Sequence, residues 1–322
     1  MIETLDITRL QLRVEQHPNV AAAGSLLENV HVLSVTGLYG SSRAMFSVGL
    51  FHKLSRHYLY ILNDAETAGY FYHDMTQIMG SQEVLFFPSA YKRAAKYGQL
   101  DAANEVLRTE TLSKLHSEDA PFIIVSYPDA LAEKTVSGAQ LRENTLQVTV
   151  GEQLDSSFVS ELLDSYGFQY VDYVYEPGQY AVRGSILDVF SFSAEHPYRI
   201  DFFGDEVETI RNFDLETQLS KEKFSNIRIV PAFERNDMKQ ASLFDSLPAS
   251  TIIGLEDIRW ISSRVESLNE DELHIDPKDV EFVKPHFLSK DNFLRNIASF
   301  KQVRFDSKML DVPDAAIHFQ IS

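Results

Sequence analysis

Strand-like and helix-like segments alternate over residues 31–126, and this alternation constrains the fold more than any other feature of the sequence. Short apolar strands are expected at four places, with helices of 3.6-residue spacing between them. The expected strands are His31–Val35, His57–Leu62, Glu83–Phe87 and Pro121–Ser126, and the expected helices are Gly40–Leu54, Asp64–Met79 and Asp101–His116. Asp64 is expected to cap the second of these helices. The alternation is typical of a parallel sheet with helices packed on its faces.

The pattern changes at about residue 141, where closely spaced strands follow one another with turn residues between them. These strands are expected at Thr145–Val150, Tyr170–Tyr175, Gln179–Phe190, Tyr198–Phe203 and Val207–Phe213. One helix is expected among them, at Ser156–Ser165. The run predicts a small α+β domain with a mostly antiparallel sheet, inserted into the larger α/β domain. Beyond it, a strand is expected at Ile227–Val230 and a helix near Leu255–Leu268.

A chain of 322 residues is too long for one ordinary core, so more than one domain is expected. We predict that residues 1–128 are the first part of the α/β domain and residues 129–214 are the small domain. Residues 215–322 are then the remainder of the α/β module.

The composition excludes several classes of site. The chain has no cysteine, which rules out disulfides, thiolate zinc sites and cysteine nucleophiles and is compatible with a cytoplasmic protein. No apolar run approaches the roughly 18 residues that span a bilayer, so we expect no membrane contact. The net charge of −18 repels phosphate backbones, so we do not expect this chain to hold DNA by itself.

Residues 37–44 lie between an expected strand and an expected helix, where a phosphate-binding loop would lie. The active loop has the pattern Gly-x-x-x-x-Gly-Lys-Ser/Thr, and the chain keeps Gly37 and also has Gly40. Ser42 replaces the second motif glycine, Arg43 replaces the lysine, and Ala44 replaces the hydroxyl that would hold magnesium. We therefore predict a degenerate loop without ATP chemistry, and a plain strand–turn–helix junction is the alternative interpretation.

The remaining motifs predict no catalytic residue and no metal site. Residues 271–274 spell Asp-Glu-Leu-His, as in helicase motors, but no apolar strand precedes them, so we expect an acidic solvated loop. The histidines show no His-x-x-x-His or Glu-x-x-His spacing typical of zinc ligands. There is no Gly-x-Ser-x-Gly nucleophile elbow.

Two neighbouring motifs carry the most specific information in the chain. Residues 183–188 read Arg-Gly-Ser-Ile-Leu-Asp, and residues 198–206 read Tyr-Arg-Ile-Asp-Phe-Phe-Gly-Asp-Glu. This run resembles the stretch shared by the excision nuclease protein UvrB and the transcription-repair coupling factor family. The resemblance is clear over roughly residues 140–220 and weaker over 25–135. The degenerate loop and the lack of a tyrosine-rich hairpin between Phe87 and Phe122 favour the coupling-factor family over UvrB.

The resemblance implies a degenerate P-loop helicase-like parallel-sheet domain, with a small inserted domain that docks the excision nuclease protein UvrA. It implies a non-catalytic adaptor in transcription-coupled nucleotide excision repair. In that family the residues matching Arg183, Arg199 and Phe203 contact UvrA. The parent protein would be an ATP-dependent DNA translocase that displaces stalled RNA polymerase. Its other domains would contact polymerase and DNA, and its motor domains would hold ATP and magnesium. This chain itself is expected to need no cofactor.

Strand periodicity gives a separate interpretation of the same run. Tyr198, Ile200 and Phe202 share one face of their strand, which is apolar and is expected to pack on the nearby helix. The opposite face places Phe203 among charges, which is typical of a protein-binding hot spot. Two alternatives remain open. The arginines could simply pair with acids such as Asp201 or Glu206. The chain could also be a nucleotide-dependent DNA-processing enzyme related to UvrB.

Overall fold

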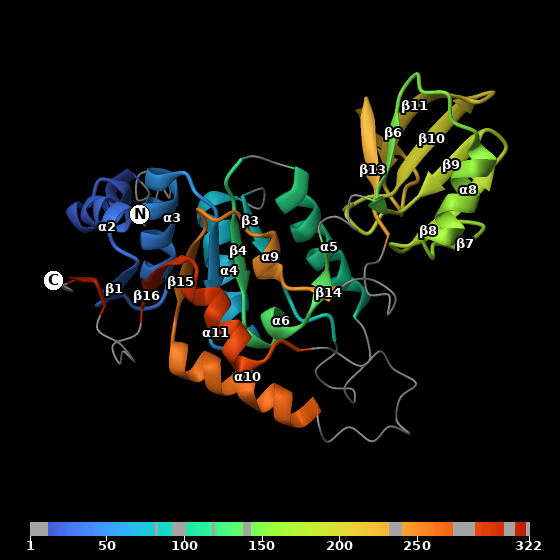
Figure 1. The fold of residues 1–322 in the computed structure, drawn as a ribbon. Helices are drawn as coiled ribbons and strands as arrows, with labels where there is room; N and C mark the ends of the chain where they lie inside the picture. Colours follow the sequence, from blue (N-terminus) through green and yellow to red (C-terminus); the bar gives the residue numbers. More distant parts are fainter. Residues whose placement is uncertain are drawn as a thin grey trace.

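The fold is that of a computed structural model, which describes residues 12–80, 83–91, 101–117, 120–137, 143–231, 240–272, 287–305 and 313–319. Figure 1 shows two lobes: a larger α/β lobe built from both ends of the chain, and a smaller lobe of mainly β structure. The smaller lobe corresponds to the middle of the sequence, as an inserted domain would.

The larger lobe is built on a seven-stranded sheet whose strand order is β17-β1-β16-β15-β2-β4-β3. Every neighbouring pair is parallel, which confirms the sheet predicted from the alternation of strands and helices. Its strands are β1 (Val32–Thr36), β2 (Tyr58–Ile61), β3 (Val84–Phe86), β4 (Ile123–Ser126), β15 (Ile252–Leu255), β16 (Lys301–Arg304) and β17 (Ala315–His318). The last three strands come from the end of the chain, so this sheet is complete only when the chain returns from the smaller lobe.

Helices cover this sheet (Figure 1). They are α2 (Pro18–Asn29), α3 (Ser42–Leu54), α4 (Ala65–Met79), α5 (Ala102–Ser117), α6 (Pro128–Ala132), α9 (Leu243–Ser246), α10 (Ile258–Glu272) and α11 (Lys290–Ala298). Asp64 caps α4 as predicted, because its carboxylate accepts a 2.8 Å hydrogen bond from the Thr67 amide.

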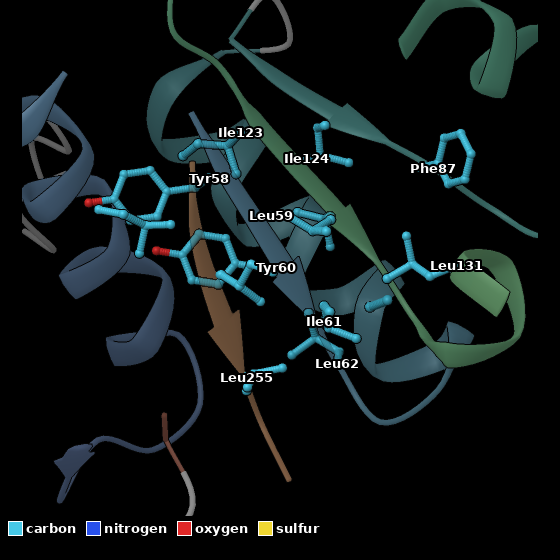
Figure 2. Packing of buried hydrophobic residues seen from close by; sticks show 14 of the residues in the cluster. Tyr58, Leu59, Tyr60, Ile61, Leu62, Phe87, Ile123, Ile124, Leu131 and Leu255 are labelled. Atoms are coloured by element: carbon cyan, nitrogen blue, oxygen red, sulfur yellow. The ribbon is translucent and has the colours of Figure 1, made fainter. Parts of the chain in front are cut away.

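The core of the larger lobe lies on both sides of its central strands. All residues of β2, β4 and β15 are buried, which is why their sequences are continuous apolar runs and do not alternate. Figure 2 shows side chains of β2, among them Tyr58 and Tyr60, packed with residues of β4 and β15. Gly254 is required here, because a Cβ at that position would lie 2.2 Å from the Tyr60 ring. The position of the Tyr60 ring over β15 therefore depends on a residue without a side chain.

The smaller lobe contains a six-stranded sheet with the order β12-β11-β10-β9-β8-β7. Its strands are β7 (Gln169–Tyr170), β8 (Gln179–Arg183), β9 (Ile186–Val189), β10 (Tyr198–Phe203), β11 (Glu206–Phe213) and β12 (Ser220–Phe224). All neighbours are antiparallel except β7 and β8, which confirms the predicted, mostly antiparallel sheet. The predicted helix is α8 (Ser156–Ser165), and β6 (Leu146–Thr149) pairs with β13 (Asn226–Ile229) as a separate ribbon. A further short pair joins β5 (Thr135–Val136) to β14 (Gln240–Ala241).

Several sequence predictions need correction. The single strand predicted at Gln179–Phe190 is two strands joined by a tight turn at Gly184, whose φ of +62° glycine adopts without strain. Only the start of the predicted strand Tyr170–Tyr175 is β structure, because Val174 turns inward to pack on Ala181. The helix predicted near Leu255 begins at Ile258, since Leu255 ends β15.

The prediction of an acidic loop at residues 271–274 is also wrong for the two of these residues that the structure describes. Asp271 and Glu272 are the last residues of α10, and Leu273 and His274 lie outside the described residues. The antiparallel sheet of the smaller lobe continues beyond residue 214, because β12 pairs with β11. Leu131 belongs to the core of the larger lobe.

Candidate partner-binding face

One face of the six-stranded sheet carries the hydrophobic core of the smaller lobe. Ile200 and Phe202 of β10 are buried in a cluster with Val159 and Leu163 of α8. This confirms that the apolar side of β10 packs on the nearby helix. The alternate residues of the strands must therefore point to the other side of the sheet. We call that other side, from β8 to β11, the outer face, and its polar and aromatic residues are Arg183, Asp188, Arg199, Asp201, Phe203, Thr209 and Arg211.

A single buried carboxylate organises the arginines of the outer face. Asp188 lies on β9 between β8 and β10, and only 1% of the residue is exposed. Arg199 donates to both of its oxygens, from Nε at 2.7 Å and from Nη2 at 2.8 Å. Arg183 also donates to Asp188 from Nη2. A carboxylate this deeply buried is stable only when it is paired, and here two guanidinium groups share it.

Aromatic rings flank this ion cluster on both sides. The Arg199 guanidinium lies 4.3 Å from the centre of the Phe213 ring, and the Arg183 guanidinium lies 5.0 Å from that of Tyr173. Both distances are within the range of cation–π attraction. The hydrogen bonds to Asp188 raise the pKa of Arg199 above its usual value. The result is one continuous row of ring, guanidinium, carboxylate, guanidinium and ring.

A second ion pair lies beside this row and is neutral overall. Arg211 Nη1 lies 2.9 Å from an oxygen of Asp201, and the Thr209 hydroxyl donates to the same carboxylate at 2.6 Å. Sequence periodicity left Asp201 or Glu206 open as partners of Arg183 and Arg199. The structure pairs both arginines with Asp188 instead, because Asp188 lies on the strand between theirs.

Phe203 is the most exposed large hydrophobic residue among the described residues, with 77% of its surface accessible. It is the last residue of β10, and the tight turn at Gly204 and Asp205 follows it directly. Its neighbour across the strand pair is Glu206, which is itself exposed. A phenylalanine at a strand end next to a turn has few neighbours to cover it, so this ring remains available to a partner.

The structure brings all three predicted contact residues to the outer face, but with different accessibility. The exposed fraction of the side chain is 37% for Arg183 and 15% for Arg199, against 77% for the whole of Phe203. Arg183 and Phe203 end their strands at the same edge of the sheet, because β8 and β10 run in the same direction on either side of β9. Phe203 and Arg183 are therefore the more accessible members, and Arg199 lies deeper.

The loop between β1 and α3 holds the residues at which the sequence predicts a degenerate phosphate-binding motif. Gly37 has a φ of +83°, and a Cβ there would lie 2.0 Å from the carbonyl oxygen of Phe319, just after β17. Ser42 accepts a 2.8 Å hydrogen bond from the Tyr39 amide and donates one to the Tyr39 carbonyl. Gly37 is thus required because the neighbouring backbone leaves no room for a side chain. The Tyr39 amide is already hydrogen-bonded to the Ser42 hydroxyl.

The basic residue of this loop is paired within the chain. Arg43 Nη1 lies 2.7 Å from Glu256 Oε1, and the other oxygen of Glu256 accepts from the Asn63 amide at 3.2 Å. Ala44 is fully buried. The charge that would meet a phosphate is therefore neutralised by a carboxylate. Sequence reasoning missed Glu256, since it lies 213 residues along the chain and has no motif of its own.

Two other kinds of feature are absent from the described residues. Among them, no group of three or more histidine and acidic side chains is placed to hold a metal ion. Within the same part of the chain, no helix is long and apolar enough to cross a membrane.

Comparisons with known proteins give one family match and several relatives. Residues 146–234 match the family described as the UvrB interaction domain. The chain is 31% identical over 157 residues to the transcription-repair-coupling factor of Haemophilus influenzae, covering 48% of the chain and 14% of that protein. It is 32% identical over 184 residues to that of Escherichia coli, covering 57% of the chain and 15% of that protein. The same factor of Bacillus subtilis is 25% identical over 201 residues, covering 62% of the chain. The chain thus spans 14–17% of the length of these relatives.

Proposed function

We propose that this chain, which carries a UvrB interaction domain and is related to transcription-repair coupling factors, is a docking module for the excision nuclease protein UvrA. The docking site is the outer face of the smaller lobe, with Phe203, Arg183 and Arg199 as its contact residues. The module itself is non-catalytic and needs no cofactor.

The exposure of Phe203 carries this proposal. An aromatic ring that is 77% exposed next to a cluster of guanidinium groups is the composition of a binding hot spot, where aromatic residues and arginine are enriched. The ring lies on the face that α8 leaves uncovered, and it ends the strand whose other face holds the core together. The sheet is thus rigid behind the residues that would meet a partner.

The test is capture of purified UvrA by the chain. The wild-type chain is expected to retain UvrA, and the triple variant Arg183→Ala/Arg199→Ala/Phe203→Ala is expected to lose it. A matched control is Phe158→Ala/Arg228→Ala, which removes an exposed phenylalanine from α8 and an exposed arginine from β13, away from the outer face. Equal retention by the wild type and the triple variant would show that the docking site is wrongly placed.

The geometry supports this function better than the alternative of a nucleotide-dependent DNA-processing enzyme. In the β1–α3 loop, Glu256 pairs with the arginine, and a side-chain hydroxyl occupies the Tyr39 amide. The alternative predicts binding of magnesium-ATP at residues 37–44. Calorimetry that shows heat of binding with magnesium-ATP, lost in Arg43→Ala, would favour the alternative over a docking module.

In the parent protein, this module would recruit UvrA to RNA polymerase stalled at a DNA lesion. The curated relatives are several times longer than this chain, which leaves room for a motor that consumes ATP and moves DNA. Polymerase and DNA would be bound by those other domains. The net charge of −18 fits a chain that leaves DNA contact to the rest of the protein.

A further inference from the structure

Asp188 is bound by both arginines of the outer face. It is 1% exposed, so no partner can reach its carboxylate directly. Its strand, β9, lies between β8 and β10, and Arg199 is its direct neighbour across the β9–β10 pair. Any influence of Asp188 on docking must therefore pass through the side chains that it holds.

We infer that Asp188 is a positioning residue of the docking face, which fixes Arg183 and Arg199 in one arrangement before a partner arrives. This inference rests on the proposed function and adds how the face achieves its affinity: the partner recognises the fixed positions of the two guanidinium groups more than their positive charge.

The need for such a residue follows from the arginine side chain. A free arginine side chain loses rotamer entropy when it is immobilised. Arg183 ends its strand beside a turn, where the Asp188 carboxylate, the Asp172 carbonyl at 3.4 Å and the Tyr173 ring constrain it. Because these contacts order the side chain in the free protein, less of that entropy remains to be lost on docking.

Charge and position make opposite predictions for one isosteric substitution. Asp188 contributes one negative charge against two positive ones, so the cluster carries a net charge of +1. In Asp188→Asn the net charge becomes +2, while the side chain keeps its size. If partner binding depended only on positive charge, this variant would bind at least as tightly as the wild type. If it depends on position, the variant binds more weakly, because the amide nitrogen cannot accept a hydrogen bond from an arginine.

The experiment is calorimetric titration of UvrA with the full chain and a set of variants. Asp188→Asn is expected to weaken binding about tenfold. In the double variant with Phe203→Ala, the factors by which the two substitutions weaken binding are expected to multiply, because the ring does not touch Asp188. Combined with Arg183→Ala, Asp188→Asn is expected to weaken binding by less than its full factor, since one of the two side chains through which it acts is already gone. The positioning role is overturned if Asp188→Asn binds UvrA as tightly as the wild type. It is also overturned if Asp188→Asn weakens binding by the same factor in the Phe203→Ala and Arg183→Ala backgrounds.

A second variant covers the case in which Asp188→Asn does not fold, judged by circular dichroism. Arg199→Lys keeps the charge and loses the two-pronged contact with Asp188. It is expected to weaken binding severalfold, and unchanged affinity would overturn the inference. A wild-type chain that gives no heat with UvrA overturns the proposed function itself. Wild-type binding with unaffected Asp188→Asn or Arg199→Lys variants overturns only the role of Asp188.

Discussion

The β1–α3 loop and the outer face both present arginine, but they use it in different ways. In the loop, Arg43 meets the single carboxylate of Glu256, and the two charges cancel. On the outer face, Arg183 and Arg199 share Asp188, so one positive charge remains. The space beside Gly37 of the loop is filled by the backbone of Phe319, whereas the outer face ends in an exposed phenylalanine. An arginine thus indicates a binding site only after its counter-charges and its neighbours have been counted.

The largest expected effect separates the stability of the larger lobe from the docking of the smaller one. Arg108 and Glu133 form a buried ion pair at 3.1 Å, with side chains that are 4% and 5% exposed. Arg108→Ala leaves the carboxylate buried without this cation and is expected to reduce the free energy of unfolding by about 3–5 kcal/mol. Urea unfolding followed by circular dichroism measures this loss. At temperatures where the variant is folded, its affinity for UvrA should equal that of the wild type; a parallel loss of affinity would show that the two lobes are not independent.

Phe203→Ala is expected to have the next largest effect, and on affinity alone. Removal of a hot-spot aromatic ring costs about 2 kcal/mol or more of binding free energy, which is roughly thirtyfold in the dissociation constant. The ring is 77% exposed, so the melting temperature of the chain should hardly change. Titration calorimetry and thermal unfolding of the same preparation measure the two quantities. A variant that melts at a lower temperature would show that Phe203 stabilises the fold. A variant that binds UvrA normally would show that Phe203 does not lie at the interface.

Arg43→Ala is expected to show the opposite behaviour. The Arg43 side chain is 25% exposed and its partner Glu256 is 16% exposed. The loss of Arg43 leaves a partly buried carboxylate whose remaining donor, among the described residues, is the Asn63 amide. We expect a loss of about 1–2 kcal/mol in unfolding free energy and no change in affinity for UvrA. Glu256→Gln with the arginine retained is the matched control. Weaker binding of UvrA by Arg43→Ala would remove the contrast between the loop and the outer face.

The smallest effect concerns the core behind the outer face. Burial and the hydrogen bond to Asp164, 2.7 Å long, raise the pKa of Tyr180 to about 12. Because the folded state keeps the proton that the unfolded state loses near pH 10, this contribution to stability is complete below about pH 10. It is lost as the pH rises through about 12. The difference in unfolding free energy between wild type and Tyr180→Phe should therefore shrink between about pH 10 and pH 12, as measured by urea unfolding at each pH. A difference that stays constant with pH would show that Tyr180 is not perturbed.

Local patterns predicted much of the fold. The cap at Asp64 and the helix Ser156–Ser165 are predicted because each depends on neighbouring residues. The parallel sheet is predicted because the alternation of strands and helices can be seen along the chain. One missed feature depends on distant residues, because the strands β16 and β17 complete the sheet from the end of the chain. The other, the turn at Gly184, is local, but it divides a run that alternates regularly on both sides.

The sequence likewise predicts some features of the candidate site and not others. Periodicity placed Arg199 and Phe203 on one face of β10, as the structure has them. The shared carboxylate could not be assigned, because the pairing of Asp188 with both arginines depends on the register of three strands. Nor does periodicity alone distinguish Arg199, 15% exposed, from the more accessible Arg183. Exposure depends on what covers a residue, and here Phe213 and Gln218 lie against Arg199.

The central claim is that the outer face, and not the β1–α3 loop, meets the partner. Hydrogen–deuterium exchange of the full chain, with and without UvrA, tests it most directly. Binding is predicted to slow exchange at the two hairpin turns that border the outer face, at residues 184–185 and 204–205, while residues 37–42 exchange as before. Protection of the loop with unchanged hairpin turns would contradict the claim.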